Sequence, residues 1–250
     1  MIVKLKKHFS GKEVMQNIKF TYDKTSKKRP AWIWVENLPK DVMFLSTRID
    51  DKIHHYRIYL STATPLFLPT NYTREEMRKF YDKYAPLYTK ETASRNSLAS
   101  AFLLQKIKIV KNEKILDLGA GSGISAIPFV KKGYKNIVLL DYSKKMLAEA
   151  RKNKELKRCK FIQQDIAKMK SREKYGLIFS MFSFASNSYF QEKEMSRLWK
   201  KVAAQLNPRG IFMMLGYDFD PPKKLFKKIQ SGKYEIVPGY QAQWYIGKKC

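Results

Sequence analysis

The stretch ILDLGAGSG at residues 115–123 decides the fold of this 250-residue chain. Its apolar start predicts a buried strand. Gly119 and Gly121 then predict a tight turn, because glycine has no Cβ and lets the backbone approach a ligand closely. The helix expected after the turn would point its first N–H groups at a bound anion. The turn therefore indicates a ligand site, and a strand-to-helix turn without a ligand is the alternative.

Helices alternate with strands on both sides of this turn, which predicts an α/β fold, a Rossmann-like parallel sheet with helices on both faces. The spacing of apolar residues predicts helices at 73–90, 94–108, 124–132, 143–152, 191–206 and 221–230. It predicts strands at 114–118, 136–141, 160–164, 175–181, 211–217, 233–237 and 241–247.

Residues 1–70 have a different pattern, in which short segments of alternating polar and apolar residues are separated by polar turns. This pattern predicts a small antiparallel β-rich module. Its strands are expected at 2–7, 17–22, 31–35, 42–48 and 53–60. Two prolines in STATPLFLPTN place the domain boundary near residue 70. We therefore expect two domains, the β-rich module at 1–70 and the domain of the glycine turn at 71–250.

The chain carries 50 basic and 22 acidic residues, a formal net charge of +28. A charge of this size would attract nucleic acid, an anionic membrane or acidic substrates at low ionic strength. The alternative is a general excess of lysine, because the basic residues are spread along the whole chain and most of them are not arginine. Composition therefore leaves a polyanionic partner as one of two interpretations.

Two cysteines, Cys159 and Cys250, are too few for a disulfide framework and fit a reducing cytoplasm. The N-terminus lacks the apolar block of a secretory signal. The longest nearly apolar stretch, 177–185, is too short to span a bilayer. We therefore expect a cytoplasmic protein without a membrane span. No paired Cys or His spacing predicts a metal site.

Three acids, Asp117, Asp141 and Asp165, lie at the carboxyl ends of successive predicted strands, where such sheets bind ligands. Asp141 lies 18 residues after Gly123, where its carboxylate would accept hydrogen bonds from both hydroxyls of a ribose. Asp165 is placed to read the edge of an adenine. The alternatives are a solvated acid at the strand end for Asp141 and a helix cap for Asp165. Asp117 would repel the pyrophosphate of NAD, so the three carboxylates favour a positively charged adenosine ligand.

Five segments together resemble the motifs of class I S-adenosylmethionine-dependent methyltransferases, of the group that acts on small molecules. They are ILDLGAGSG, LLDYS (139–143), QQDIA (163–167), YGLIFSMFSFAS (175–186) and LNPRGIFMML (206–215). The resemblance implies the cofactor S-adenosyl-L-methionine and a methyl-transfer activity. It leaves the N-terminal module unassigned.

The resemblance also implies a set of cofactor-binding residues. Asp117 would lie near the methionine amino group, Asp141 would hold the ribose, and Asp165 with the Ile166 backbone would hold adenine. The full set is Tyr81, Tyr88, Asp117, Gly119, Gly121, Asp141, Tyr142, Met146, Asp165, Ile166 and Ser180.

Four of these residues would enclose the cofactor in the related enzymes. Tyr142 and Met146 would lie against the adenine ring, and Tyr81 and Tyr88 would close the methionine end. The alternative for the two helix tyrosines is that they pack an amphipathic helix on the sheet.

The residues after the fourth strand would face the methyl acceptor, and we expect Phe182, Phe184 and Asn187 to contact it. No Asn-Pro-Pro-Tyr tetrad occurs there, which is evidence against amino methylation of DNA bases or glutamine. No catalytic base is evident, because all three histidines lie in the N-terminal module. Alignment of the acceptor with the cofactor methyl group would supply most of the catalysis.

The expected function is methyl transfer from S-adenosylmethionine to a small-molecule or lipid-like acceptor. A second interpretation is an RNA or tRNA methyltransferase that uses the basic surface and the N-terminal module. A third is a catalytically inactive cofactor-binding protein that serves as an interaction partner. The sequence does not identify the acceptor or the oligomeric state.

Overall fold

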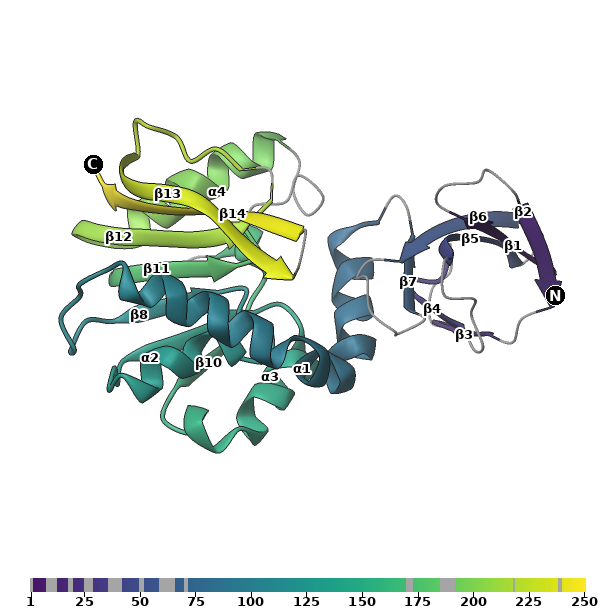
Figure 1. The fold of residues 1–250 in the computed structure, drawn as a ribbon, viewed down its shortest axis with the longest axis horizontal. Helices are drawn as coiled ribbons and strands as arrows, with labels where there is room; N and C mark the ends of the chain where they lie inside the picture. The colour runs from purple at the N-terminus through teal and green to yellow at the C-terminus, as the bar shows by residue number, and fades with distance from the viewer. Residues whose placement is uncertain are drawn as a thin grey trace. The chain divides into compact units, whose positions relative to one another are not determined.

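The computed structural model has two units, Met1–Tyr84 and Ala85–Cys250, and Figure 1 shows the elements of both. The structure describes residues 2–7, 13–17, 20–24, 29–35, 42–49, 52–58, 66–69, 72–169, 173–184, 192–217, 219–237 and 240–250. In this part of the chain, no helix has both the length and the apolar character needed to cross a membrane.

A seven-stranded sheet forms most of the first unit, in the order β2-β1-β5-β6-β7-β4-β3, and all its pairs are antiparallel. The strands are β1 Ile2–Lys7, β2 Glu13–Asn17, β3 Phe20–Tyr22, β4 Ile33–Val35, β5 Val42–Ile49, β6 Lys52–Ile58 and β7 Leu66–Pro69. The antiparallel module expected at the N-terminus is therefore confirmed. Strands β2 and β7 were not predicted, because neither alternates polar with apolar residues. Each forms by pairing with its neighbours in the sheet.

Helix α1 (Arg74–Gln105) begins in the first unit and continues into the second. The Thr73 hydroxyl accepts a hydrogen bond from the Glu76 N–H at 3.2 Å, and the Glu76 carboxylate accepts one from the Thr73 N–H at 2.6 Å. Arg29 Nε donates to Glu76 Oε1 at 2.9 Å, which attaches the start of the helix to the β-rich module. The division between the units therefore falls inside α1. The domain boundary near residue 70 stays a prediction.

The sequence predicted two helices at 73–90 and 94–108, and this prediction is wrong because α1 is continuous. The three residues between the two predicted helices include neither glycine nor proline, so nothing in them ends the helix. Thr92 also bonds within the helix, since its hydroxyl donates to the Tyr88 carbonyl oxygen at 2.7 Å.

The second unit is built on a seven-stranded sheet in the order β10-β9-β8-β11-β12-β14-β13 (Figure 1). The first five strands are parallel, and β14 and β13 form an antiparallel hairpin at one edge. The strands are β8 Ile115–Leu118, β9 Ile137–Asp141, β10 Lys160–Gln163, β11 Tyr175–Met181, β12 Leu206–Gly216, β13 Phe226–Val237 and β14 Tyr240–Lys249. The helices besides α1 are η1 Ile124–Ala126, α2 Ile127–Lys131, α3 Lys144–Lys152, η2 Lys154–Leu156, η3 Ile166–Lys168 and α4 Glu192–Gln205.

Each face of this sheet has its own apolar core, because successive strand residues point to opposite sides. On one face, Phe179 of β11 stacks on Phe129 of α2 with ring centroids 4.6 Å apart, and α1 and α3 pack on the same side. On the other face, Phe212 of β12 meets Trp199 of α4 at 5.4 Å. The predicted Rossmann-like sheet with helices on both faces is confirmed.

The C-terminal region differs from the prediction. We predicted a short helix at 221–230, whereas Phe226 begins β13 and pairs along its length with β14. Leu225, Phe226 and Ile229 have helical spacing, but strand pairing buries Phe226 almost completely, to 1% exposure. Tertiary packing therefore overrides the local helical pattern. The predicted strands at 233–237 and 241–247 are confirmed within the hairpin.

Candidate functional site

The turn after β8 has a backbone that only glycine adopts easily. Gly119, Gly121 and Gly123 have φ of 79°, 54° and 73°. A Cβ on Gly119 would lie 2.3 Å from Cβ of Ser183, so this position has no room for a side chain. The N–H groups of Gly119 and Ala120 both donate to the Leu140 carbonyl oxygen, at 2.8 and 2.9 Å. The turn is thus held against the end of β9.

The carboxylate of Asp141 connects this turn to the start of α3. Its Oδ2 accepts a hydrogen bond from the Gly121 N–H at 2.8 Å, and its Oδ1 accepts one from the Ser143 N–H at 2.7 Å. Ser143 in turn caps α3, with its hydroxyl accepting from the Met146 N–H at 3.0 Å. Asp141 is therefore ordered by the backbone rather than simply solvated.

Asp117 is buried beneath the turn, with 1% of its surface exposed. Its Oδ2 has no hydrogen-bond partner among the described residues. Burial raises the pKa of this carboxyl well above its usual range, and the nearby Asp141 charge adds to the effect. A positively charged ligand group at Oδ2 would reverse this shift and stabilise the ionised form.

Tyr88 of α1 lies over the glycine turn. A Cβ on Gly121 would lie 3.5 Å from Cε1 of Tyr88, and burial raises the pKa of this phenol. Asn96, eight residues further along α1, donates from Nδ2 to the Tyr88 hydroxyl at 3.1 Å. Asn96 was not among the site residues expected from the sequence. Its spacing could have identified it, since a separation of eight residues places it on the same side of a continuous helix as Tyr88.

Tyr81 belongs to the first unit, where its ring meets Phe80 edge to face at 5.5 Å. Its expected place at the methionine end of a cofactor stays a prediction.

The expected adenine residues follow β10. Asp165 caps η3, with its Oδ1 accepting from the Ala167 N–H at 2.8 Å, as the helix-cap alternative predicts. Ile166 lies next to the turn, with its Cδ1 3.5 Å from the position of a Cβ on Gly119. Met146 is buried, and Tyr142 is partly exposed directly after β9. The contacts of these residues with adenine stay predictions.

The residues after β11 differ in their surroundings, and of these Ser183 contacts the glycine turn. Ser183 donates from its hydroxyl to the Gly119 carbonyl oxygen at 2.8 Å. Phe182, with φ of 64°, lies 5.8 Å from the ring of Tyr217 at the end of β12. Asn187 lies outside the described residues.

Phe184 does not lie where the sequence analysis expected it. It is fully buried and packs edge to face on Trp199 at 4.6 Å and on Phe212 at 5.7 Å. Its side chain belongs to the core beneath α4, because an apolar ring gains more from burial there than from exposure at the strand end. It is therefore not an acceptor-facing residue in this structure.

Several buried polar atoms near the turn lack a hydrogen-bond partner among the described residues. Such atoms are rare in protein interiors, because each costs about 1–3 kcal/mol, and a cluster of them indicates a ligand site. They are Asn96 Oδ1, Asp117 Oδ2, Ser122 Oγ and Ser180 Oγ. The described residues contain no group of three or more His, Cys, Asp or Glu side chains that could hold a metal ion. The site therefore offers carboxylate, hydroxyl and amide groups around a glycine turn.

Comparison with known proteins agrees with this geometry. A family model for a methyltransferase domain matches residues 115–210. This segment is a methyltransferase domain. It contains the glycine turn, all three strand-end acids and the strands β8 to β11. A search of curated protein sequences finds no match.

Solved structures extend the likeness beyond this segment. The DhpI–SAH complex matches with a TM-score of 0.55 and 16% identity, covering 70% of this chain and 96% of that chain. The magnesium protoporphyrin IX methyltransferase ChlM from Synechocystis PCC 6803, with bound SAM, matches with a TM-score of 0.54 and 17% identity, covering 71% and 97%. The 1,6-didemethyltoxoflavin-N1-methyltransferase from Burkholderia thailandensis matches with a TM-score of 0.54 and 15% identity, covering 82% and 98%. The predicted class I methyltransferase fold is confirmed.

Proposed function

We propose that the methyltransferase domain binds S-adenosyl-L-methionine at the glycine turn and transfers its methyl group to a small-molecule or lipid-like acceptor. The single observation that carries this proposal is the buried carboxyl of Asp117, whose Oδ2 has no partner among the described residues. A buried carboxylate is costly unless a cation pairs with it, and the methionine part of this cofactor carries an ammonium group. NAD offers no such cation at the turn.

The residues around the turn suit the other parts of the same cofactor. Asp141 is held by two backbone N–H groups, and we propose that its carboxylate also accepts hydrogen bonds from the ribose hydroxyls. Asp165 and Ile166 lie at the end of β10 for the adenine, and Tyr88 lies over Gly121. We propose that Tyr142, Met146 and Ser180 complete the pocket.

Catalysis would come mainly from positioning. S-adenosylmethionine supplies a methyl group on a positively charged sulfur, which is a good leaving group. The chain then has to hold the acceptor in line with this methyl group and keep water out. The buried, neutral phenol of Tyr88 and the aromatic pair of Phe182 and Tyr217 would do this. We assign no general base.

The apolar end of β11 supports a small or lipid-like acceptor. Phe182 and Tyr217 form an aromatic surface there, which suits a planar or apolar molecule. Two of the similar structures are named as methyltransferases of ring compounds, a magnesium protoporphyrin and a didemethyltoxoflavin. We also propose a cytoplasmic location, because both cysteines are free thiols.

The test is methyl transfer from cofactor labelled on the methyl group. The full chain would be incubated with a small-molecule extract and, separately, with total RNA, and Asp141→Ala would serve as the inactive control. Label in a small molecule, absent with Asp141→Ala, supports the proposal. Label in RNA alone would overturn the acceptor class. Cofactor binding without label in either fraction would indicate the inactive interaction protein.

A further inference from the structure

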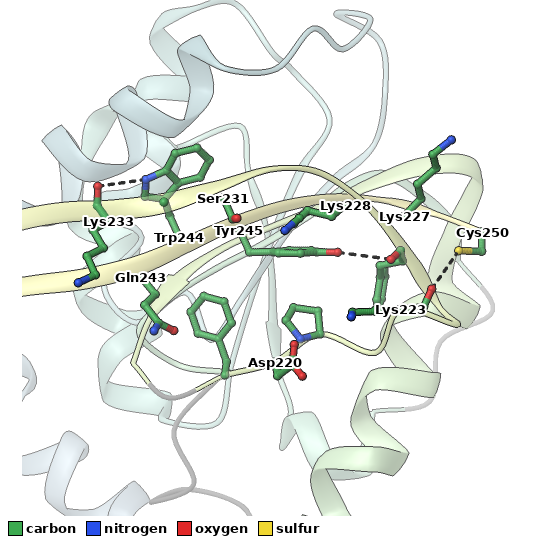
Figure 2. A pocket seen from close by; sticks show the side chains of 14 residues that line it. Asp220, Lys223, Lys227, Lys228, Ser231, Lys233, Gln243, Trp244, Tyr245 and Cys250 are labelled. Atoms are coloured by element: carbon green, nitrogen blue, oxygen red, sulfur yellow. Dashed lines mark hydrogen bonds between the residues drawn. The ribbon is translucent and has the colours of Figure 1, made fainter.

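A second concave site lies on the β13–β14 hairpin, away from the glycine turn (Figure 2). It is a groove of about 880 Å³ between the hairpin and the segment 219–226, and we call it the hairpin groove. Ser231 pairs with Tyr245 and Lys233 with Gln243, so these side chains share the groove face of the sheet. Nothing in the proposed methyl transfer uses them.

The groove exists because the helical layer on this face stops short of the hairpin. Helix α4 packs on β11 and β12, and its Trp199 reaches only as far as Phe226, with ring centroids 5.8 Å apart. The segment 221–230, predicted as a helix, forms a turn and then β13. In the described part of the chain, no helix covers the outer part of this face.

Four lysines line the hairpin groove, and all four are exposed: Lys223, Lys227, Lys228 and Lys233. None of them forms an ion pair with another described residue, whereas Lys79, Lys114, Lys152 and Lys160 all do. The only acid in the lining is Asp220. The groove therefore brings four positive charges together with a single acid.

The floor between these lysines is flat and apolar. The ring of Tyr245 lies across Gly247, where a Cβ would come within 2.5 Å of Cε1, and its hydroxyl donates to the Phe226 carbonyl oxygen at 3.5 Å. Phe219, which is partly exposed, extends the floor, whereas the ring of Phe226 is buried in the core. In Figure 2, Lys223 and Lys228 lie near the Tyr245 ring, Lys233 lies on the side of Gln243, and Lys227 points away from the ring. A ligand that fits must combine several anionic groups with flat apolar ones.

We propose that the hairpin groove binds a single-stranded polynucleotide, with its phosphates on the lysines and its bases against the aromatic floor. Single-stranded nucleic acid combines these two features, and proteins hold it in basic grooves with aromatic side chains. An acidic peptide would use the lysines but would leave the aromatic floor without a partner. Gln243 would add an amide for the edge of a base.

The groove also has a defined direction on the sheet. Gln243 pairs with Gly216 at the carboxyl end of β12, the edge of the sheet that carries the glycine turn. Cys250 and Lys223 lie toward the opposite edge, and the Cys250 thiol donates to the Lys223 carbonyl oxygen at 3.7 Å. A polynucleotide in the groove would thus extend from the edge of the proposed active site along the hairpin.

The test compares two double variants that change net charge equally. Lys228→Glu with Lys233→Glu alters the groove, and Lys154→Glu with Lys157→Glu alters exposed lysines around η2. Binding of a fluorescent oligouridine of roughly ten nucleotides to the full chain is followed by anisotropy at near-physiological salt. We expect the groove variant to bind about tenfold more weakly and the control less than about twofold more weakly. Equal losses of oligouridine affinity in both variants would overturn the proposal, because they would show that the RNA responds to the overall positive charge and not to the groove.

A competition experiment tests the class of ligand, and further controls test whether the variants remain folded and bind the cofactor. Polyglutamate of equal charge should displace the oligouridine poorly, and displacement as strong as that by unlabelled oligouridine would overturn the choice of a polynucleotide. If the groove variant lowers the thermal midpoint, Lys228→Gln with Lys233→Gln replaces it, compared with Lys154→Gln and Lys157→Gln. Cofactor binding by calorimetry is measured on each variant, so that failure of the proposed methyltransferase function is seen separately from failure at the groove.

Discussion

The two ends of the second unit's sheet have opposite charge. The parallel strands β8, β9 and β10 end in or lead to Asp117, Asp141 and Asp165, with two of these carboxylates fixed by backbone N–H groups. The antiparallel hairpin carries lysines without ion-pair partners among the described residues. A chain of net charge +28 therefore keeps a locally acidic site for a cationic cofactor. The net charge of the chain predicts the local charge at neither end of the sheet, because a ligand interacts mainly with charged groups within about 10 Å of it.

The largest effect should follow from a side chain at the acidic end. Gly119→Ala forces a Cβ to within 2.3 Å of Ser183 and keeps φ at 79°, whereas Gly133→Ala has a similar φ of 85° but open space. We expect Gly119→Ala to lower the unfolding free energy by about 3 kcal/mol, and Gly133→Ala by about 1 kcal/mol. Urea denaturation measures both. Equal losses would mean that the turn is not closely packed.

Asp141→Ala should weaken binding of the cofactor at the acidic site, whereas a change in the hairpin groove should not. Loss of two charge-assisted hydrogen bonds to a ribose should weaken cofactor binding by about 1.5–3 kcal/mol, measured by calorimetry. The unfolding free energy should also fall by about 1–2 kcal/mol, because the Gly121 and Ser143 N–H groups lose their acceptor. The control is Lys228→Glu in the hairpin groove, and a variant Asp141→Ala that binds as tightly as this control would remove Asp141 from the site.

Asp117→Asn should stabilise the folded protein and weaken its binding of the cofactor. The pKa of Asp117 in the folded protein is raised by burial, so its protonated form stabilises the fold at low pH, and this stability is lost as the pH rises through the raised pKa. We therefore expect the variant to gain on the order of 1 kcal/mol over the parent at pH 8 and almost nothing at pH 3. Thermal unfolding at the two pH values measures this. A variant less stable than the parent at pH 8 would show that the buried carboxylate has a partner.

The smallest effect is expected where charges already satisfy one another. Glu173 accepts hydrogen bonds from Lys114, Tyr175 and Lys160 at the amino ends of the strands, and the first of these does most to lower its pKa from 4.5 to about 2. The stability from this lowered pKa is present above pH 4.5 and lost as the pH falls toward 2. Because the side chain is 36% exposed, we expect Glu173→Gln to cost only about 0.5 kcal/mol at neutral pH. If Glu173→Gln still lowered the unfolding free energy at pH 2, the stabilisation would not come from the lowered pKa of Glu173.

The acidic end could be predicted from sequence because local rules determine it. Gly119 and Gly121 can be identified as a turn without knowledge of the fold, and Asp141 ends a strand whose apolar run is unmistakable. The double backbone contact of Asp141 could not be predicted, since it depends on how the turn folds back over β9. Asn96 was missed for a different reason: the sequence predicted two separate helices there, and only in the continuous α1 does its spacing from Tyr88 have meaning.

The hairpin could not be predicted in the same way. Leu225, Phe226 and Ile229 have helical spacing, and only pairing with β14 makes them part of a turn and strand. Phe184 was misplaced because its position after β11 gives no sign that it turns back into the core under Trp199. Without the sheet, the lysines of 223–233 could not be assigned to one face, and so the hairpin groove was not expected.

The most direct test of the acidic end is calorimetric titration of the full chain with S-adenosylmethionine and with NAD. We expect saturable binding of S-adenosylmethionine and no binding of NAD, because the turn presents carboxylates to the ligand. Affinity should rise with pH until Asp117 is ionised in the free protein, since binding of the ammonium group requires that proton to leave. Saturable binding of NAD, with no heat from S-adenosylmethionine at any pH, would contradict the account.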